Sequence, residues 1–318
     1  MGRRRSGREV NGIVLLDKPP GMSSNAALQA VKRVFNARKA GHTGSLDPLA
    51  TGLLPLCLGE ATKVSAFLLD ADKAYDAEIR LGVTTTTGDS EGQITAERAT
   101  DHLDESKVRQ VLARFAGEIE QIPPMYSAIK KDGQPLYKLA RKGIEVERSP
   151  RRVTISKLEL LHWDTDYLKV SVWCSKGTYI RTLAEDIGST LECGAHLLSL
   201  RRTASGPFSL DAATELVTLE KSSGDAPALD AFLLPTDAAL TALPSVLLDE
   251  DSADFVTRGN KVRLAEQLRQ GIVRMYGPAE IFLGIGEITG DGCVAPRRIM
   301  CGSQKNTEKK GKNPGNSL

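Results

Sequence analysis

Apolar residues in the first three quarters of the chain follow two different spacings. Between Tyr75 and Val83, apolar and polar residues alternate, which predicts a strand with one buried face. Other short apolar runs predict strands at 13–16, 153–161 and 168–174. Apolar residues at helical spacing predict helices that begin at Ser24 or Asn25, at Asp104 and near Tyr179, and a further helix over 61–69. Strands and helices are therefore mixed along this part of the chain.

The pattern changes after residue 243. Short apolar runs separated by turn residues predict strands at 244–248, 271–273, 281–287 and 292–295. Before this change, residues 211–243 combine helical spacing with an exposed loop near 222–227. We therefore predict four parts: a flexible basic arm at 1–9, a large domain at 10–243, a small β-rich domain at 244–301 and a disordered tail at 302–318.

Composition narrows the class of protein. The 318 residues are 41% hydrophobic and 26% charged, as in an ordinary globular protein. No apolar run is long enough to predict a membrane span, and no apolar stretch after the arginine-rich start predicts a secretion signal. The five cysteines are scattered without a CxxC pair, which favours neither a disulfide framework nor a zinc finger. Cys193 and His196 have metal-like spacing but no second pair. We expect a cytoplasmic protein without a metal site.

The net charge of +2 is informative only when it is divided along the chain. Four arginines lie in residues 1–8, and four lysines against one glutamate lie in residues 302–318. The remainder is slightly acidic, so a polyanionic partner must be bound by local basic patches.

One such patch is predicted between residues 128 and 152. It holds eight basic residues, namely Lys130, Lys131, Lys138, Arg141, Lys142, Arg148, Arg151 and Arg152. Tyr126 and Tyr137 accompany them. Basic side chains beside aromatic rings suit a nucleic-acid groove, because phosphates are neutralised while bases stack. A solvated helix face would give the same composition, and the residues alone leave both interpretations open.

The chemistry of the chain centres on Asp47, within the segment from Gly41 to Gly52. The residue before a proline is held out of the helical region, and glycines permit close approach of a ligand. Such a loop presents its carboxylate. A plain turn, in which Asp47 bonds its own backbone, remains the alternative at this point. A phosphate loop is excluded, because Gly59-Glu60-Ala61 lacks the Gly-Lys-Ser/Thr sequence.

Arg181 is the second unusual residue, because a cation in the first turn of a helix opposes the positive end of the helix dipole. A carboxylate partner would explain its position. Asp47 is the candidate.

The segment Gly-His-Thr-Gly-Ser-Leu-Asp-Pro-Leu-Ala-Thr-Gly-Leu-Leu resembles the catalytic motif of the bacterial tRNA pseudouridine-55 synthases, the TruB family. Further segments are similar to motifs of that family and occur in its order, namely 11–24, 59–63, 122–130, 177–183 and 200–203. The resemblance covers about residues 10 to 300. It implies an α+β fold, with a mixed, mainly antiparallel sheet in a catalytic core of the pseudouridine synthase type. It also implies a small C-terminal β-rich domain similar to the PUA domain.

The resemblance implies that the chain is an isomerase that converts uridine 55 of the tRNA T-loop to pseudouridine. Asp47 would be the catalytic carboxylate on a flipped-out base, and Arg181 would keep it ionised and oriented. His42, Tyr75, Tyr179 and Leu200 would bind the target nucleotide. Lys18, Lys130, Lys131, Arg141 and Lys142 would bind RNA. The family similarity implies a monomer that needs no cofactor, metal or protein partner.

Asp47 could attack the base, attack C1′ or remove a sugar proton, and the sequence does not choose among these routes. Two rival functions also remain. A non-catalytic RNA-binding protein that assists tRNA folding would explain the charges but would leave the Asp47 loop without a purpose. A glycosidase for small nucleosides would require a second acid nearby.

Overall fold

The computed structural model describes residues 7–127, 129–131, 133–265 and 268–300. The chain divides into two compact units, with the boundary between residues 239 and 240. Residues 1–6 of the predicted arm and the predicted tail lie outside the described residues. Arg8 is described and forms an ion pair with Asp230 at 2.7 Å, so this part of the predicted arm belongs to the folded unit.

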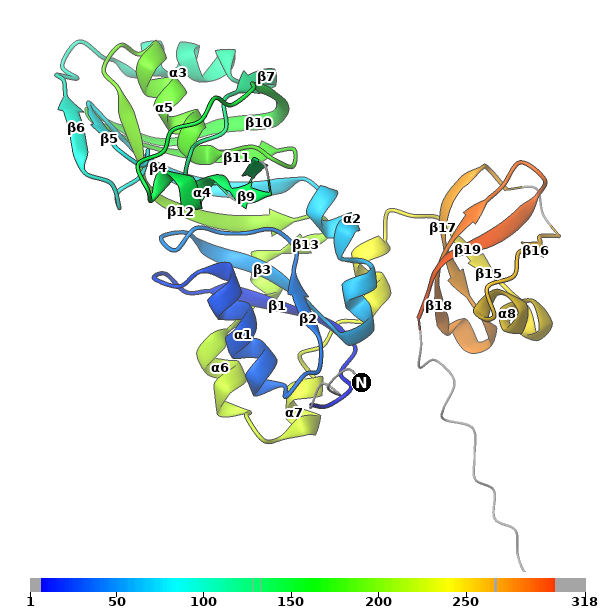
Figure 1. Ribbon diagram of the computed structural model, residues 1–318. Coiled ribbons are helices and arrows are strands. Elements are labelled where there is room, and N and C mark those ends of the chain that lie inside the picture. The colour runs from blue at the N-terminus through cyan, green and yellow to red at the C-terminus, as the bar shows by residue number, and fades with distance from the viewer. Residues whose placement is uncertain (1–6, 128, 132, 266–267, 301–318) are drawn as a thin grey trace, which may run out of the picture. The chain divides into compact units, whose positions relative to one another are not determined.

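The first unit is built on a long mixed sheet (Figure 1). Its strands, in spatial order, are β14 (Thr214–Glu215), β1 (Gly12–Lys18), β3 (Thr51–Leu58), β12 (Ala195–Ser205), β4 (Lys73–Leu81), β11 (Tyr167–Cys174), β10 (Arg151–Asp164) and β7 (Gly117–Gln121). Two short strands join this path: β2 (Ala40–His42) pairs with β3, and β13 (Phe208–Ser209) pairs with β12. Among these described strands, β1 with β14 and β3 with β12 are parallel, and the other neighbours are antiparallel.

The strands predicted from the apolar pattern are confirmed in β1, β4, β10 and β11. In β4, Tyr75, Ala77, Ile79 and Leu81 are buried, whereas the polar residues between them are half-buried. Helices α3 (Glu105–Arg114) and α5 (Ile180–Thr190) pack their apolar residues into the same core as β4 and β11. This core positions the start of α5, which carries Arg181.

The second core of this unit lies under helix α1 (Ser24–Val34), between α1, β1 and β3. Leu28, Val31 and Phe35 are buried there as the spacing predicted. The cap is one residue earlier than expected, because the Ser23 side chain accepts the hydrogen bond from the backbone of Ala26. The predicted helix at 61–69 is split into a 3₁₀ turn, η1 (Gly59–Lys63), and α2 (Ser65–Asp70).

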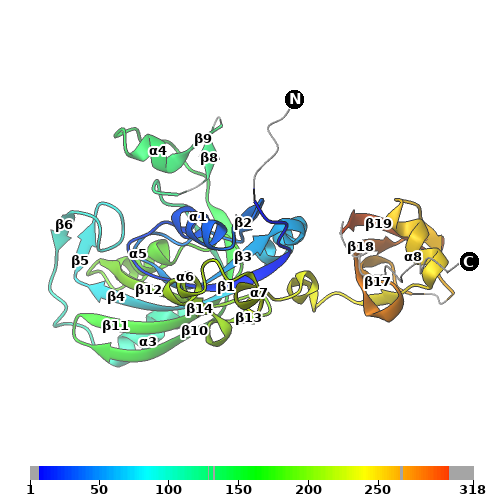
Figure 2. The same cartoon turned by 90° about the horizontal axis from the view of Figure 1, so that it is seen from below.

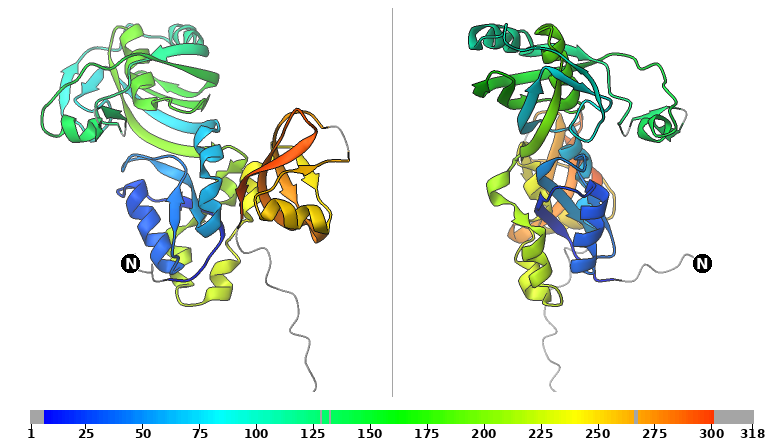
Figure 3. Two further views of the ribbon diagram at one scale, coloured as in Figure 1. Left: turned by 45° about the vertical axis from the view of Figure 1, so that its right-hand side comes forward. Right: turned by 90° about the vertical axis from the view of Figure 1, so that its left-hand side faces the viewer.

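A small basic segment projects from the sheet, as Figures 2 and 3 both show. It contains β8 (Lys130–Lys131), β9 (Gln134–Pro135) and α4 (Leu136–Ala140). We call residues 129–142, of which 132 is not described, the projecting segment. The remaining elements of the unit are β5 (Val83–Thr85), β6 (Ile94–Glu97), η2 (Leu210–Ala212), α6 (Leu216–Lys221), α7 (Ala226–Asp230) and η3 (Thr236–Leu240).

The second unit contains a sheet in the order β15 (Ser245–Leu247), β17 (Gly271–Tyr276), β18 (Phe282–Ile288), β19 (Cys293–Ile299) and β16 (Val262–Arg263). A 3₁₀ turn, η4 (Pro278–Glu280), connects β17 to β18. The strands predicted after residue 243 are confirmed. Helix α8 (Glu250–Thr257) was not predicted, and it buries only Ala253 and Val256, which give a weak periodic signal.

Candidate active site

Asp47 lies in the loop between β2 and β3, and backbone hydrogen bonds hold this loop in place. Its own carbonyl accepts a hydrogen bond from Ala50 N at 3.1 Å, which forms a turn. The carbonyl of Pro48 accepts a bond from Gly21 N at 2.9 Å. The Asp47 carboxylate is free of this backbone turn and points to another element, so the loop presents its acid.

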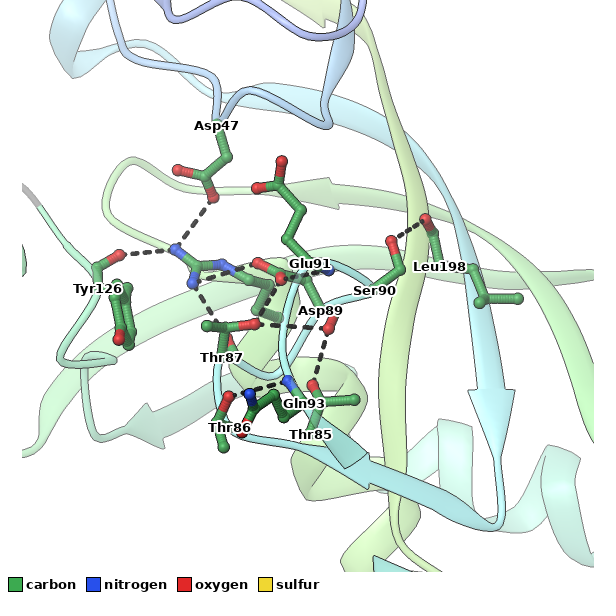
Figure 4. Close-up of polar contacts among 11 residues, drawn as sticks. Asp47, Thr85, Thr86, Thr87, Asp89, Ser90, Glu91, Gln93, Tyr126 and Leu198 are labelled. Carbon is green, nitrogen blue, oxygen red and sulfur yellow. Dashed lines mark hydrogen bonds and ion pairs between the residues drawn. The ribbon is translucent and has the colours of Figure 1, made fainter. Parts of the chain in front are cut away.

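The partner of that carboxylate is Arg181, whose Nη2 lies 3.0 Å from Asp47 Oδ2. A dashed line from Asp47 marks this ion pair in Figure 4. The Arg181 side chain is only 6% exposed, whereas 44% of the Asp47 side chain is exposed. The ion pair predicted from the position of Arg181 in the first turn of α5 is thus confirmed. The arginine is a fixed, buried cation that orients a carboxylate accessible from outside.

Arg181 is itself held by a network that the sequence did not indicate. Its Nη2 donates to the carbonyl of Tyr126 at 2.7 Å, and its Nη1 donates to the carbonyl of Thr87 at 3.1 Å. Its Nη1 also lies 3.5 Å from Asp89 Oδ2. Both carbonyls come from segments far apart in the sequence, so the guanidinium has one orientation.

Asp89 is a member of this network that the sequence did not indicate. It lies in the polar segment after β5, yet only 4% of it is exposed. Its Oδ1 accepts bonds from Thr87 Oγ1 at 2.5 Å and from Glu91 N at 3.1 Å. An aspartate among threonines and glycines looks like an ordinary turn residue, so a signal for its burial was absent from the local pattern.

Two carboxylates share the Arg181 guanidinium, but burial has the largest effect on the pKa of Asp47. Burial raises the pKa of Asp47 above its ordinary value of 3.8. Arg181 opposes this and lowers the pKa, Asp89 raises it, and Lys18 lowers it slightly. The pKa of Asp47 is raised overall, so Arg181 offsets only part of the effect of burial on the ionised carboxylate.

Two other residues expected to bind the target nucleotide, Tyr75 and Leu200, share one apolar cluster. Tyr75 from β4 is buried in it with Leu46 and Ala50, which flank Asp47 in the loop, and Leu200 from β12 packs against it while partly exposed. Burial raises the pKa of the Tyr75 phenol, which stays neutral. The structure thus brings these two residues next to the loop.

Tyr179 and His42 lie at the ends of elements. Tyr179 is the N-cap residue of α5, two positions before Arg181, and burial raises the pKa of its phenol. His42 ends β2. Its Nδ1 is buried and has no hydrogen-bond partner among the described residues. Burial and the charge of Arg202 lower the pKa of His42 below 6.5, so the ring is neutral.

Lys18 does not have the role expected from the resemblance. Its side chain is fully buried, and its Nζ donates to the carbonyls of Met22, Pro19 and Pro48, at 2.7, 2.8 and 3.4 Å. Burial lowers the pKa of Lys18 to about 8. This geometry lends no support to the expectation that Lys18 binds RNA, because its ammonium group donates to three backbone carbonyls, one of them in the Asp47 loop.

Arg202 is a further buried cation that the sequence did not single out. It is 1% exposed, and its Nε donates to the carbonyl of Leu53 at 2.6 Å. Its Nη2 lies 3.4 Å from the carbonyl of Gly44 in the Asp47 loop. Arg202 and Lys18 are therefore two buried cations that donate hydrogen bonds to backbone carbonyls of the Asp47 loop, those of Gly44 and Pro48.

The other residues expected to bind RNA lie in the projecting segment. Lys130, Lys131, Arg141 and Lys142 are exposed there. An open pocket of about 450 Å³ is lined by Gly133, Gln134, Pro135, Lys138, Arg141 and Lys142. The Arg141 guanidinium lies 5.6 Å from the centre of the Tyr137 ring. This part of the chain offers positive charge beside an aromatic ring, as the composition indicated.

Cys193 and His196 bond to backbone carbonyls. Cys193 Sγ donates to Gly194 O at 3.2 Å, and His196 Nδ1 lies 2.8 Å from Val83 O. No group of three metal-binding side chains occurs among the residues that the structure describes. In the same described part of the chain, no helix is long and apolar enough to cross a membrane.

Comparison with solved structures identifies the fold. A crystal structure of a Cbf5–Nop10–Gar1 complex contains a chain with a TM-score of 0.69 and 28% identity, covering 91% of this chain and 84% of that one. An archaeal box H/ACA Nop10–Cbf5 complex gives a TM-score of 0.69 and 26% identity, covering 92% and 87%. The expected α+β fold of the pseudouridine synthase type is confirmed.

Sequence comparison then identifies the family. Residues 32–180 match the N-terminal domain of the TruB family of pseudouridylate synthases, and residues 181–241 and 244–300 match two C-terminal TruB domains. The tRNA pseudouridine synthase B of Pseudomonas aeruginosa is 54% identical over 299 residues, which cover 93% of this chain and 98% of that protein. The synthase of Ectopseudomonas mendocina is 55% identical, with 93% and 97% covered. This chain belongs to the TruB family of pseudouridylate synthases.

Proposed function

We propose that this protein isomerises uridine 55 in the T-loop of tRNA to pseudouridine, with Asp47 as the catalytic carboxylate. The observation that carries the proposal is the ion pair between a buried arginine and an accessible carboxylate, in a loop flanked by apolar residues. Relatives that share over half of its sequence are named tRNA pseudouridine synthases.

The reaction breaks the C1′–N1 bond, turns the base and joins C5 to C1′. The proton on C5 is lost and N1 gains one, so no atom is added or removed overall. The site must therefore supply a carboxylate beside the sugar and a pocket that retains the freed base. Asp47 supplies the carboxylate. Leu200 and Tyr75 supply apolar and aromatic surface against which the base rests.

Protonation states in the site fit this role. Arg181 stabilises the ionised form of Asp47, and this opposes the effects of burial and of Asp89 on its pKa. His42 is neutral, so it can fill the space that a flipped base leaves in the RNA without adding a buried charge. Asp47 acts on the base, on C1′ or on a sugar proton, and all three routes need its charged form.

For substrate binding, we propose that the T-stem-loop contacts Lys130, Lys131, Arg141 and Lys142. We also propose that residues 10–243 form the catalytic domain and residues 244–301 an RNA-binding domain. The boundary between the compact units falls a few residues before this division. The protein would act as a monomer without a protein partner. Its four described cysteines are free thiols, which suits a reducing cytoplasm.

The rival function, an RNA-binding protein that only assists tRNA folding, accounts for the projecting segment. It gives no reason to bury Arg181 against two carboxylates, since a buried charge is costly. The nucleoside glycosidase is likewise less well supported, because Asp89 is fully engaged with Arg181, Thr87 and Glu91.

The test is modification of a T-arm transcript by the purified protein, measured as pseudouridine content after digestion. Pseudouridine should form at position 55 and be absent when that position is cytidine. Free uridine and uridine monophosphate should not react. Hydrolysis of the nucleoside with release of uracil would support the glycosidase instead.

A further inference from the structure

The backbone of Leu46, just before Asp47, forms two hydrogen bonds with the buried hydroxyl of Ser24. Ser24, the first residue of α1, is 3% exposed. Leu46 N donates to its Oγ at 2.7 Å, and the same Oγ donates to Leu46 O at 3.0 Å. One side chain therefore satisfies both backbone groups of the residue that precedes the catalytic carboxylate.

An equivalent arrangement lies on the other side of the ion pair. Gln121, the last residue of β7, is 2% exposed. Tyr179 N donates to its Oε1 at 3.0 Å, and its Nε2 donates to Tyr179 O at 3.2 Å. Tyr179 is the N-cap of α5 and uses no capping side chain of its own, so Gln121 fixes the point where the helix begins. Arg181 follows two residues later.

Both segments need an external support. The Asp47 loop contains Gly44 at φ of +119°, and a glycine restricts the backbone less than any other residue does. The backbone N–H groups in the first turn of a helix have no acceptor within the helix, so the start of α5 needs partners from other segments. Tyr126, five residues after Gln121, provides the carbonyl that accepts from Arg181 Nη2, so this part of the chain contacts the start of α5 at two points.

We propose that Ser24 and Gln121 are positioning residues that together set the distance between Asp47 and Arg181. Neither side chain contacts the carboxylate or the guanidinium. Ser24 holds the backbone next to Asp47, and Gln121 holds the backbone near Arg181, so each side chain, which we call a backbone clamp, fixes one member of the ion pair. A site of this kind works only when its groups are held within about 0.5 Å of the productive geometry. The inference rests on the proposed function of Asp47.

The test compares Ser24→Ala and Gln121→Met with the wild-type protein on a T-arm transcript. Each variant should reduce the single-turnover rate at saturating RNA by about tenfold or more, while the dissociation constant changes by less than about threefold. Ser24→Thr retains the hydroxyl and should restore most of the rate. Ser65→Ala is the matched control, because Ser65 Oγ donates at 2.9 Å to the carbonyl of Thr62, which belongs neither to the Asp47 loop nor to α5. It should behave as wild type.

The pH dependence of the rate separates positioning from simple structural support. Arg181 and Lys18 lower the pKa of Asp47, and Asp89 raises it. If the clamps hold Arg181 close, both variants should lose activity at a higher pH on the acid side than wild type does. Lower thermal stability with an unchanged rate and an unchanged acid limb would overturn the proposal. So would weakened RNA binding alone. If one variant does not fold, the other decides.

A failure of the proposed function is recognisable separately. If wild-type protein makes no pseudouridine, the carboxyl ¹³C resonance of Asp47 can be titrated in the free protein. An upward shift of its pKa in Ser24→Ala and Gln121→Met, and none in Ser65→Ala, would still support positioning. An identical titration in all four proteins would overturn it.

Discussion

Replacing Arg181 by methionine should change both the rate and its pH dependence. Arg181 Nη2 lies 3.0 Å from Asp47 Oδ2, and an opposite charge at this distance lowers a carboxyl pKa by about 1 to 3 units. Because 44% of the Asp47 side chain is exposed, solvent screens the pair and the lower end of that range applies. The pKa of Asp47 should therefore rise by about one unit when the guanidinium is lost.

The sign follows from the direction of the shift. The pKa of Asp47 already lies above 3.8, and losing Arg181 raises it further. The ionised form that catalysis needs is then lost at a higher pH as the solution is acidified. We expect the acid limb of the single-turnover rate to move upward by about one pH unit, and the plateau to fall by about tenfold or more.

The assay is pseudouridine formation on a T-arm transcript at saturating protein from pH 5 to 8. Arg181→Lys is the matched control, because it keeps the charge but not the fork that reaches the carbonyls of Thr87 and Tyr126. It should keep the acid limb near its wild-type position and lower the plateau. Urea unfolding is measured in parallel, since leaving Asp89 buried without its cation should cost about 3 to 5 kcal/mol of stability. An unchanged acid limb in a folded Arg181→Met protein would refute the reasoning.

Three further predictions concern other parts of the chain. The affinity for a T-stem-loop should fall steeply as the salt concentration rises, and the double substitution Lys130→Gln and Lys131→Gln should reduce the slope of log affinity against log salt concentration by about two. An unchanged slope would exclude these lysines from phosphate contact. Removing residues 240–318 should weaken tRNA binding more than it lowers the single-turnover rate on bound tRNA, because Asp47, Tyr75, Arg181 and Leu200 all belong to the first unit. A lower rate with unchanged affinity would contradict this prediction. The pKa of buried Lys73 is lowered from 10.5 to about 8, so the unfolded chain binds more protons between these values and stability due to this residue rises with pH. Relative to Lys73→Met, the wild-type free energy of unfolding should gain about 3 kcal/mol from pH 8 to pH 10.5, and a constant difference in urea titrations would disprove the shift.

Elements with strong periodicity were predictable from the sequence because local pattern and tertiary packing agree in them. Alternation gave β4 and helical spacing gave α3 and α5, since their apolar faces form the core. The Asp47 loop and its partner Arg181 were also predictable, from glycines around a pre-proline aspartate and from a cation at an unfavourable helix end.

Residues whose role depends on burial were not predictable. Asp89 looks like a turn residue, and Lys18 looks like a surface cation, but long-range packing buries both. Ser24 was predicted as one of two possible helix caps, whereas Ser23 caps α1 and the Ser24 hydroxyl forms hydrogen bonds with the Leu46 backbone. In each case one partner is distant in the sequence, namely Arg181 for Asp89, Pro48 for Lys18 and Leu46 for Ser24, and residue spacing carries no signal over such separations.

Asp47→Asn tests the central claim most directly. Asparagine is nearly isosteric and keeps the turn formed by Ala50 N and the carbonyl of residue 47, but it removes the charge that a nucleophile or base must carry. The measurement is the pseudouridine content of a T-arm transcript after single turnover, together with a binding titration. Combined with Arg181→Met, the substitution should cost little more than it does alone, because the two residues act as one unit. We predict that pseudouridine formation by Asp47→Asn falls by several orders of magnitude while affinity changes by less than about tenfold, or roughly 1.4 kcal/mol. Modification at the wild-type rate by Asp47→Asn would contradict the assignment of Asp47 as the catalytic residue.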